Sequence, residues 1–151
     1  DEFSVALGER GDWAVMLGRQ VAKRRVRFSV VRGRRAGGRT VRQRLAPATY
    51  GYPTDAQAAV AVDAGGRTYA AWTRAVRPRA GRSPRASIIA AVARRGRPFR
   101  RGRVLAAAGR KRDCSFPRLA ALPRGGAALR WRCTPFSADD EAPEDESLHR
   151  P

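Results

Sequence analysis

The sequence predicts an all-β fold, because one β-hairpin pattern is written three times along the chain. The clearest copy spans residues 60–72, where an alternating apolar run, the turn sequence Asp63-Ala64-Gly65-Gly66 and a second alternating run follow one another. Alternation with a period of two is typical of strands that bury one face, and Asp and Gly tolerate the backbone conformations of tight turns. Residues 5–17 and 119–131 are imperfect copies of this pattern.

The copies recur at a nearly constant distance. They end at Leu17, Trp72 and Trp131, which are 55 and 59 positions apart. Repeats of roughly 40 to 50 residues that each form a four-stranded sheet are typical of β-propellers, and this spacing is slightly longer. The sequence therefore predicts antiparallel four-stranded blades of a partial β-propeller, about two and a half in number.

The expected boundaries follow the alternation of apolar residues and the positions of Gly and Pro. A first blade is expected over residues 1–45, with strands at 3–7, 13–17, 26–32 and 41–45. A crossing loop over 46–57 leads to a second blade over 58–108, with strands at 59–62, 68–72, 87–93 and 103–107. A partial third blade, the hairpin 109–133, has strands at 118–122 and 127–132.

Residues 134–151 are acidic, contain three prolines among few apolar residues, and are expected to form a disordered tail. Two and a half blades cannot close a ring, since propellers need about four to eight. We therefore expect other blades of the same longer chain, and prefer their placement ahead of Asp1 to assembly of several chains.

The chain is strongly basic, with 32 Lys and Arg against 13 Asp and Glu and a formal net charge of +19. Such a charge predicts attraction to polyanions: a cell-wall polymer, an acidic polysaccharide or nucleic acid. The basic clusters in the inferred turns and crossings are the candidate polyanion-binding residues: Lys23, Arg24, Arg25, Arg100, Arg101, Arg103, Arg110, Lys111 and Arg112. A solvated surface in an Arg-biased proteome is the alternative interpretation.

Cys114 and Cys133 flank the third hairpin. If its strands pair around Arg124 and Gly125, the two cysteines face one another and can form a disulfide; two unlinked cysteines are the alternative. A disulfide favours an oxidising compartment, so we expect an extracellular or cell-envelope location. No run approaches the about 20 apolar residues of a transmembrane helix. Two cysteines and the lone His149 do not make a four-ligand site, and no metal or cofactor is expected.

The hairpin 60–72 resembles the strand-turn-strand unit of NHL-like and related bacterial β-propeller repeats, in which Ala-Val-Asp-x-x-Gly-x-x-Tyr recurs once per blade. The residues that match this pattern are Ala61, Val62, Asp63, Gly66 and Tyr69. The hairpin is also similar to Val-Ala-Val-Asp repeats of uncharacterised exported proteins from high-GC bacteria. In the other two copies, Gly8 and Pro123 replace the Asp of the pattern. The resemblance implies an architecture and no particular activity.

The hairpin also resembles, less closely, the Asp-box of sialidases, a Ser-x-Asp-x-Gly-x-Thr-Trp hairpin. Gly65 lies at the right distance from Asp63, but Ala61 holds the Ser place, and Thr68 and Tyr69 each fall one position late. A glycosidase needs two converging carboxylates, and no such pair can be identified here. The only histidine lies in the tail, so no Ser-His-Asp set is available and no catalytic residue is assigned.

Two groups of single residues have competing interpretations. Asp63 is expected to cap its own turn rather than to act as a ligand or acid-base group, and the same holds for Asp12 and Asp55. Four aromatic residues at hairpin positions are expected to pack between sheets: Trp13, Tyr69, Trp72 and Trp131. Tyr50 and Tyr52 in the Pro/Gly loop are better candidates for stacking on a ligand.

The function predicted first is that of a non-enzymatic exported β-propeller-like repeat module that acts in binding or as a scaffold, toward polyanionic ligands. One alternative is a fragment of a sialidase-like or glycoside-hydrolase-like propeller enzyme. The other is an Arg-rich nucleic-acid-binding protein, whose retention on DNA would survive moderate salt.

Overall fold

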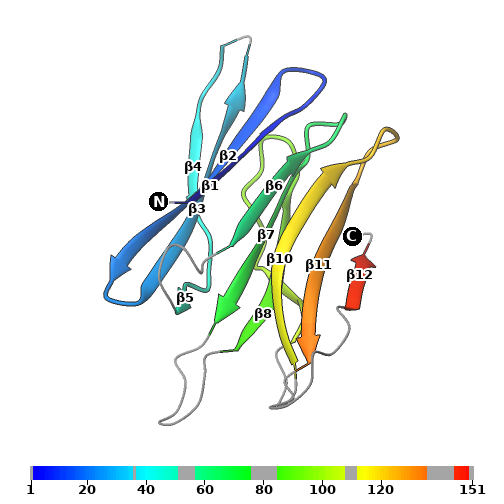
Figure 1. Ribbon diagram of the computed structural model, residues 1–151. Coiled ribbons are helices and arrows are strands. Elements are labelled where there is room, and N and C mark those ends of the chain that lie inside the picture. Colours follow the sequence, from blue (N-terminus) through cyan, green and yellow to red (C-terminus); the bar gives the residue numbers. More distant parts are fainter. Residues whose placement is uncertain are drawn as a thin grey trace.

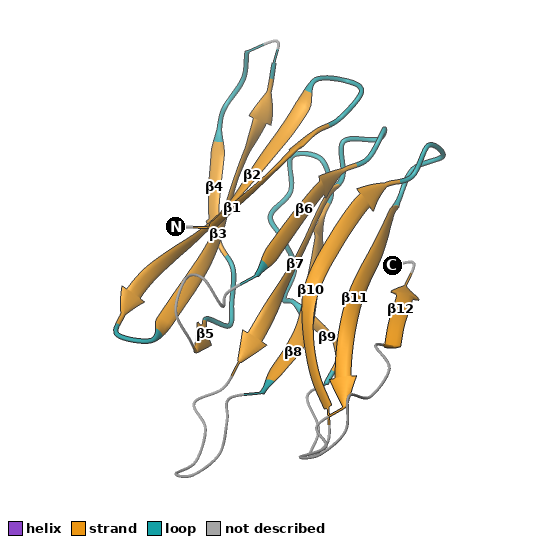
Figure 2. Cartoon of the chain, viewed as in Figure 1, coloured by secondary structure: helices purple, strands orange, loops and turns teal. Residues whose placement is uncertain are grey.

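The computed structural model describes residues 2–35, 37–50, 57–75, 85–107, 112–135 and 145–149, and all regular secondary structure in them is β-strand (Figure 2). In sheet A the neighbouring strands are, in order, β1 (Glu2–Leu7), β2 (Asp12–Ala22), β3 (Arg25–Arg34) and β4 (Val41–Arg44), and β5 (Thr49–Tyr50) also pairs with β3. In sheet B the order is β6 (Ala58–Val62), β7 (Thr68–Ala75), β8 (Ala86–Ala93) and β9 (Arg103–Ala106). In sheet C the order is β10 (Arg112–Ala121), β11 (Ala127–Pro135) and β12 (Asp145–His149).

The three sheets stack in chain order, with sheet B in the middle (Figure 1). Strands β1 and β2 pack against β6, and β10 packs against β6, β7 and β8. Every strand pair is antiparallel, which confirms the predicted all-β antiparallel class. The turns of the three repeated hairpins lie at one end of the stack, at the top of Figure 1.

The three hairpins have the same strand register. Val5 pairs with Val15, Val60 with Ala70, and Leu119 with Leu129, so the pairs recur at the spacings seen in the sequence. One glycine recurs in the same way: Gly11, Gly66 and Gly125 have φ angles of 73°, 76° and 86°. A residue with a side chain is strained in this left-handed region, so the conserved geometry of the turn depends on glycine.

The hydrogen bonds across the turns locate the position of Asp63 in the other copies. The N–H groups of Gly8, Asp63 and Leu122 each donate to the carbonyl oxygen four residues later, over 2.7, 3.0 and 3.0 Å. Leu122, and not Pro123, therefore occupies the place of Asp63 in the third hairpin. The alignment inferred from the resemblance was wrong by one residue there.

Each sheet has two faces, which we name from sheet B. The front face of sheet B carries Val60, Val62, Ala70 and Trp72, and the equivalent positions define the front faces of sheets A and C. The opposite, or back, face of sheet B carries Ala61, Tyr69 and Ala71. In each hairpin these two sets alternate along the strands, as a half-buried pleated strand requires.

Two cores result from front-to-back stacking. Core 1 joins the back of sheet A to the front of sheet B, and its largest buried members are Met16, Phe28, Trp72 and Ile89. Core 2 joins the back of sheet B to the front of sheet C and includes Ala71, Ile88, Leu129 and Trp131. Trp72 is 0% exposed and Tyr69 and Trp131 are buried, so the prediction that these aromatic residues pack between sheets is confirmed for them. Trp13 is half-buried.

Two strands were not expected. The crossing loop 46–57 contains β5, in which Tyr50 pairs with Arg25 and Thr49 with Val26. Of the tail that was expected to be disordered, residues 136–144 and 150–151 lie outside the described residues, and Asp145–His149 form β12, paired with β11. This register places Glu146 opposite Arg132. Hydrophobic patterning could not reveal a strand recruited by an open sheet edge.

Candidate anion-binding site

A cavity of about 800 Å³ lies where the β2–β3 turn of sheet A meets the end of β7 in sheet B. We call it the basic pocket. Its lining residues are Ala22, Lys23, Arg24, Arg25, Ala48, Thr49, Tyr50, Arg74 and Ala75. Four of these nine residues are cationic and none is acidic, so the pocket has a positive potential that attracts anions.

Local structure explains how the cations come together. Lys23 and Arg24 form a two-residue turn between β2 and β3, and Arg24 adopts a φ of 56°, which is unusual for a residue with a side chain. The next residue, Arg25, begins β3 and pairs with Tyr50. The tight turn therefore presents three consecutive basic side chains beside one aromatic ring.

Thr49 joins the pocket to sheet B. It is 1% exposed, and its Oγ1 accepts a hydrogen bond of 2.8 Å from the backbone N–H of Ala75. This bond holds the end of β7, and with it Arg74, against β5. Arg74 is the cation that sheet B contributes to the pocket.

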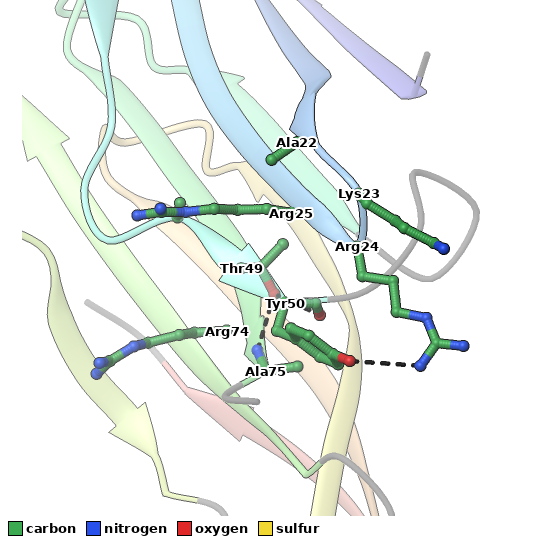
Figure 3. Close-up of a pocket in the computed structure, with 9 residues that line it drawn as sticks. Ala22, Lys23, Arg24, Arg25, Thr49, Tyr50, Arg74 and Ala75 are labelled. Atoms are coloured by element: carbon green, nitrogen blue, oxygen red, sulfur yellow. Dashed lines mark hydrogen bonds between the residues drawn. The ribbon is translucent and has the colours of Figure 1, made fainter. Parts of the chain in front are cut away.

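Figure 3 shows how the side chains lie. Arg25 and Arg74 extend in the same direction from two different sheets, whereas Lys23 and Arg24 lie on the other side of the Tyr50 ring. One guanidinium nitrogen of Arg24 donates to the Tyr50 hydroxyl over 3.4 Å. Planar guanidinium groups on both sides of an aromatic ring can bind several closely spaced phosphate, sulfate or carboxylate groups.

The structure brings together only part of the predicted basic set. Lys23, Arg24 and Arg25 share the pocket with Tyr50, the predicted stacking residue. Arg100, Arg101 and Arg103 lie in the β8–β9 connection and on β9 and do not line this pocket. Arg112 begins β10, while Arg110, Lys111 and Tyr52 lie outside the described residues.

Sequence reasoning missed Arg74 and Thr49. Both lie within or beside strands, where a single arginine or threonine carries no local signal for a site. Their positions follow from the contact of β5 with β7, which is a contact between different sheets.

Asp63 holds the turns of two neighbouring sheets together. Its Oδ1 accepts hydrogen bonds from the N–H groups of Gly65 and Arg67, each over 2.9 Å, which confirms that it caps its own turn. Its Oδ2 accepts from the Tyr69 hydroxyl over 3.0 Å and from the Gly126 N–H over 2.9 Å. Gly126 belongs to the turn of sheet C, so this carboxylate also links sheet B to sheet C.

The environment of Asp63 favours its charged form. Burial opposes ionisation, but the hydrogen bonds from Gly126, Arg67, Tyr69 and Gly65 outweigh it and hold the pKa of Asp63 below its usual value. Burial, together with the bond to Asp63, raises the pKa of the Tyr69 hydroxyl. A carboxylate whose lone pairs are used in this way has a structural role.

Asp12 does not cap its own turn as expected. Its carboxylate forms an ion pair of 2.9 Å with Arg95 of sheet B and one of 3.4 Å with Arg34 of sheet A.

Nearby, Arg32 donates to the carbonyl oxygens of Arg94 and Arg97 and lies over the Phe99 ring, 5.1 Å from its centre. Burial lowers the pKa of Arg32. These contacts fasten the end of β8 to sheet A. Asp55 lies outside the described residues.

The predicted disulfide is present between Cys114 and Cys133, which are opposite one another on β10 and β11. A bulge between Ser115 and Arg118 shifts the register by one residue and brings the cysteines opposite each other. Phe116 has a φ of 55° in this bulge, and its N–H donates to Gln57 Oε1 at the start of sheet B. The bulge thus both aligns the disulfide and contacts the neighbouring sheet.

No helix in the described part of the chain has the length and apolar character that would let it cross a membrane. Comparisons with protein-family models, with characterised proteins and with solved structures each gave no match.

Proposed function

We propose that this chain is a non-enzymatic binding module whose stacked sheets are successive β-propeller-like blades, and that the basic pocket binds an anionic polysaccharide or cell-wall polymer. The observation that carries the proposal is that Lys23, Arg25 and Arg74, which come from two sheets, line one pocket together with Tyr50. Multiple cations on a rigid frame bind a polyanion through release of its counterions.

The disulfide favours this ligand class over nucleic acid. Disulfides persist in oxidising compartments, so we propose that the protein acts outside the cytoplasm, in the extracellular space or cell envelope. Acidic glycans and wall polymers are the abundant polyanions there. The Tyr50 ring adds an apolar surface that suits a sugar ring between charged groups.

Three of the described aspartates support a binding role over a glycosidase. Asp63 and Asp12 are held by the contacts described above, and Asp113 Oδ1 accepts a hydrogen bond of 2.6 Å from the Ala86 N–H. Each of these carboxylates stabilises the stack, and they lie in different turns and strands rather than as a facing pair.

A charge-matched comparison tests the pocket. The first variant carries Lys23→Gln, Arg25→Gln and Arg74→Gln; the control carries Arg100→Gln, Arg101→Gln and Arg103→Gln and removes the same charge elsewhere. Binding to a sulfated heparin fragment is measured by titration at several salt concentrations. We expect the first variant to lose at least about tenfold in affinity and its salt slope to fall by roughly 2, and the control to lose much less.

Equal losses in the two variants would show that general surface charge, and not the pocket, binds the polymer. Tighter binding of the unaltered protein to single-stranded DNA of matched charge would support the nucleic-acid alternative instead. Unfolding curves for both variants establish that the substitutions leave the fold intact.

A further inference from the structure

The half of the front face of sheet A that β1 and β2 form is apolar and uncovered, whereas the half on β3 and β4 carries Arg27, Arg42 and Arg44. Phe3, Val5 and Leu7 of β1 are 70%, 61% and 72% exposed. They stand beside Leu17, Val15 and Trp13 of β2, their direct partners in the ladder. Six apolar side chains therefore form one continuous surface. Isolated exposed apolar residues are ordinary, whereas a contiguous patch indicates an interaction site.

The equivalent faces of sheets B and C show how such a face is covered elsewhere in this molecule. The positions equivalent to Val5 and Leu7 in sheet B are Val60 and Val62, which are 4% and 3% exposed under the back face of sheet A. In sheet C, the position equivalent to Val15 is Leu129, which is 0% exposed under the back face of sheet B. At both interfaces a front face is covered by the back face of another sheet of the same repeat.

From this we infer that the β1–β2 half of the front face of sheet A is a docking surface for one further sheet of this repeat, which covers it with its back face. This inference rests on the proposed blade arrangement and is independent of polyanion binding. We expect the back face of this further sheet to carry apolar residues at the positions of Ala61 and Ala71, where sheet A has Ala6 and Met16.

A second copy of the chain does not offer such a face. The back faces of its sheets A and B are already buried in the two cores. Its remaining back face, on sheet C, has Arg118 directly opposite Arg130, and both are exposed. Covering Phe3, Val5 and Leu7 with these arginines would desolvate charges on an apolar surface at a high cost in free energy. The observations therefore favour an additional repeat as the occupant.

The test adds a second copy of sheet B, whose back face already covers the front face of sheet C in this structure. In the extended chain, residues 58–111, which are sheet B and its connection to sheet C, are repeated ahead of Asp1. In the control chain the same segment follows Pro151. The substitution Leu7→Asp is then placed in the original, extended and control chains, and unfolding temperatures are measured.

In the original and control chains Leu7 is exposed, so Leu7→Asp should shift the unfolding temperature by less than about 2 °C. In the extended chain it should lower that temperature by roughly 5 °C or more, because the aspartate would be buried without a partner. Hydrogen exchange in β1 should slow in the extended chain alone. Equal effects of Leu7→Asp in the three chains would overturn the inference.

A different occupant would also be recognised. If the original chain forms a dimer whose β1 amides are protected, and Leu7→Asp dissociates it, the face joins two copies and the inference is wrong. Heparin binding is followed in the same samples. The basic pocket lies at the end of β2 that is far from Leu7. Loss or retention of heparin binding in these samples therefore tests the proposed function separately from the docking surface.

Discussion

Removal of the Asp63 carboxylate should destabilise the whole stack, because this group joins two turns. The variant Asp63→Ala leaves four donors without their acceptor: the N–H groups of Gly65, Arg67 and Gly126 and the Tyr69 hydroxyl. Gly65 and Arg67 are exposed, so their N–H groups can bind water in the variant. The Tyr69 hydroxyl and the Gly126 N–H have less access to water and carry most of the cost.

At about 1.5 kcal/mol for each of these two lost bonds to a charged group, the free energy of unfolding should fall by about 3 kcal/mol. In a chain of this size this corresponds to a decrease of roughly 6 to 12 °C in the unfolding temperature. Calorimetry measures it, with Glu9→Ala, an exposed acidic residue, as the control. A decrease no larger than that of the control would refute a linking role for Asp63.

The pH dependence gives an independent check. Because folding lowers the pKa of Asp63, its charge stabilises the native state above about pH 4, and this contribution is lost as the pH falls through the lowered pKa. Asp63→Asn cannot titrate. The stability difference between the unaltered protein and Asp63→Asn should therefore be largest near neutral pH and shrink at lower pH. A difference that does not change with pH would contradict this explanation.

Three further changes test the rest of the stack. Reduction of Cys114–Cys133, which are 19 positions apart, should lower the free energy of unfolding by about 3 kcal/mol in urea titrations, with no effect of reductant on the Cys114→Ala/Cys133→Ala variant. Trp72→Phe should lower the free energy of unfolding by less than about 1.5 kcal/mol, since the indole Nε1 has no hydrogen-bond partner in the described part of the chain. Trp72→Ala should lower it by about 3 to 5 kcal/mol. Equal losses in the two variants would place the role of Trp72 in its N–H group. Asp12→Ala should cost about 1 kcal/mol, and less at high salt, because its partners Arg95 and Arg34 are partly exposed; a loss that is independent of salt would argue against the ion pairs.

The hairpins could be predicted from sequence because their signals are local. Alternation around Asp63 and Gly66 places both strands and the turn within about a dozen residues, and the copies repeat it in register. The disulfide followed from the same pairing, since Cys114 and Cys133 flank one turn. Its alignment nevertheless depends on a bulge at Phe116 that no local pattern indicated.

Contacts between sheets could not be predicted in this way. The acceptor role of Asp63 toward Gly126 joins residues 63 positions apart, and the ion pair between Asp12 and Arg95 joins residues 83 positions apart. Only part of the basic pocket could be predicted from the sequence. The run from Lys23 to Arg25 indicated its positive charge, but Arg74 lines the pocket only because β5 lies against β7. Each of these contacts is a consequence of how the sheets stack, and joins residues too far apart in the sequence to leave a local signal.

The stacking order of the sheets can be measured through Met16, the only methionine in the chain. Met16 lies on the back face of sheet A in core 1, so a methyl-labelled sample gives a single signal from that interface. Nuclear Overhauser effects from this methyl group should reach side chains on the front face of sheet B, Trp72 among them. Contacts with Leu129 or Cys133 of core 2, or none with sheet B, would contradict the front-to-back stacking.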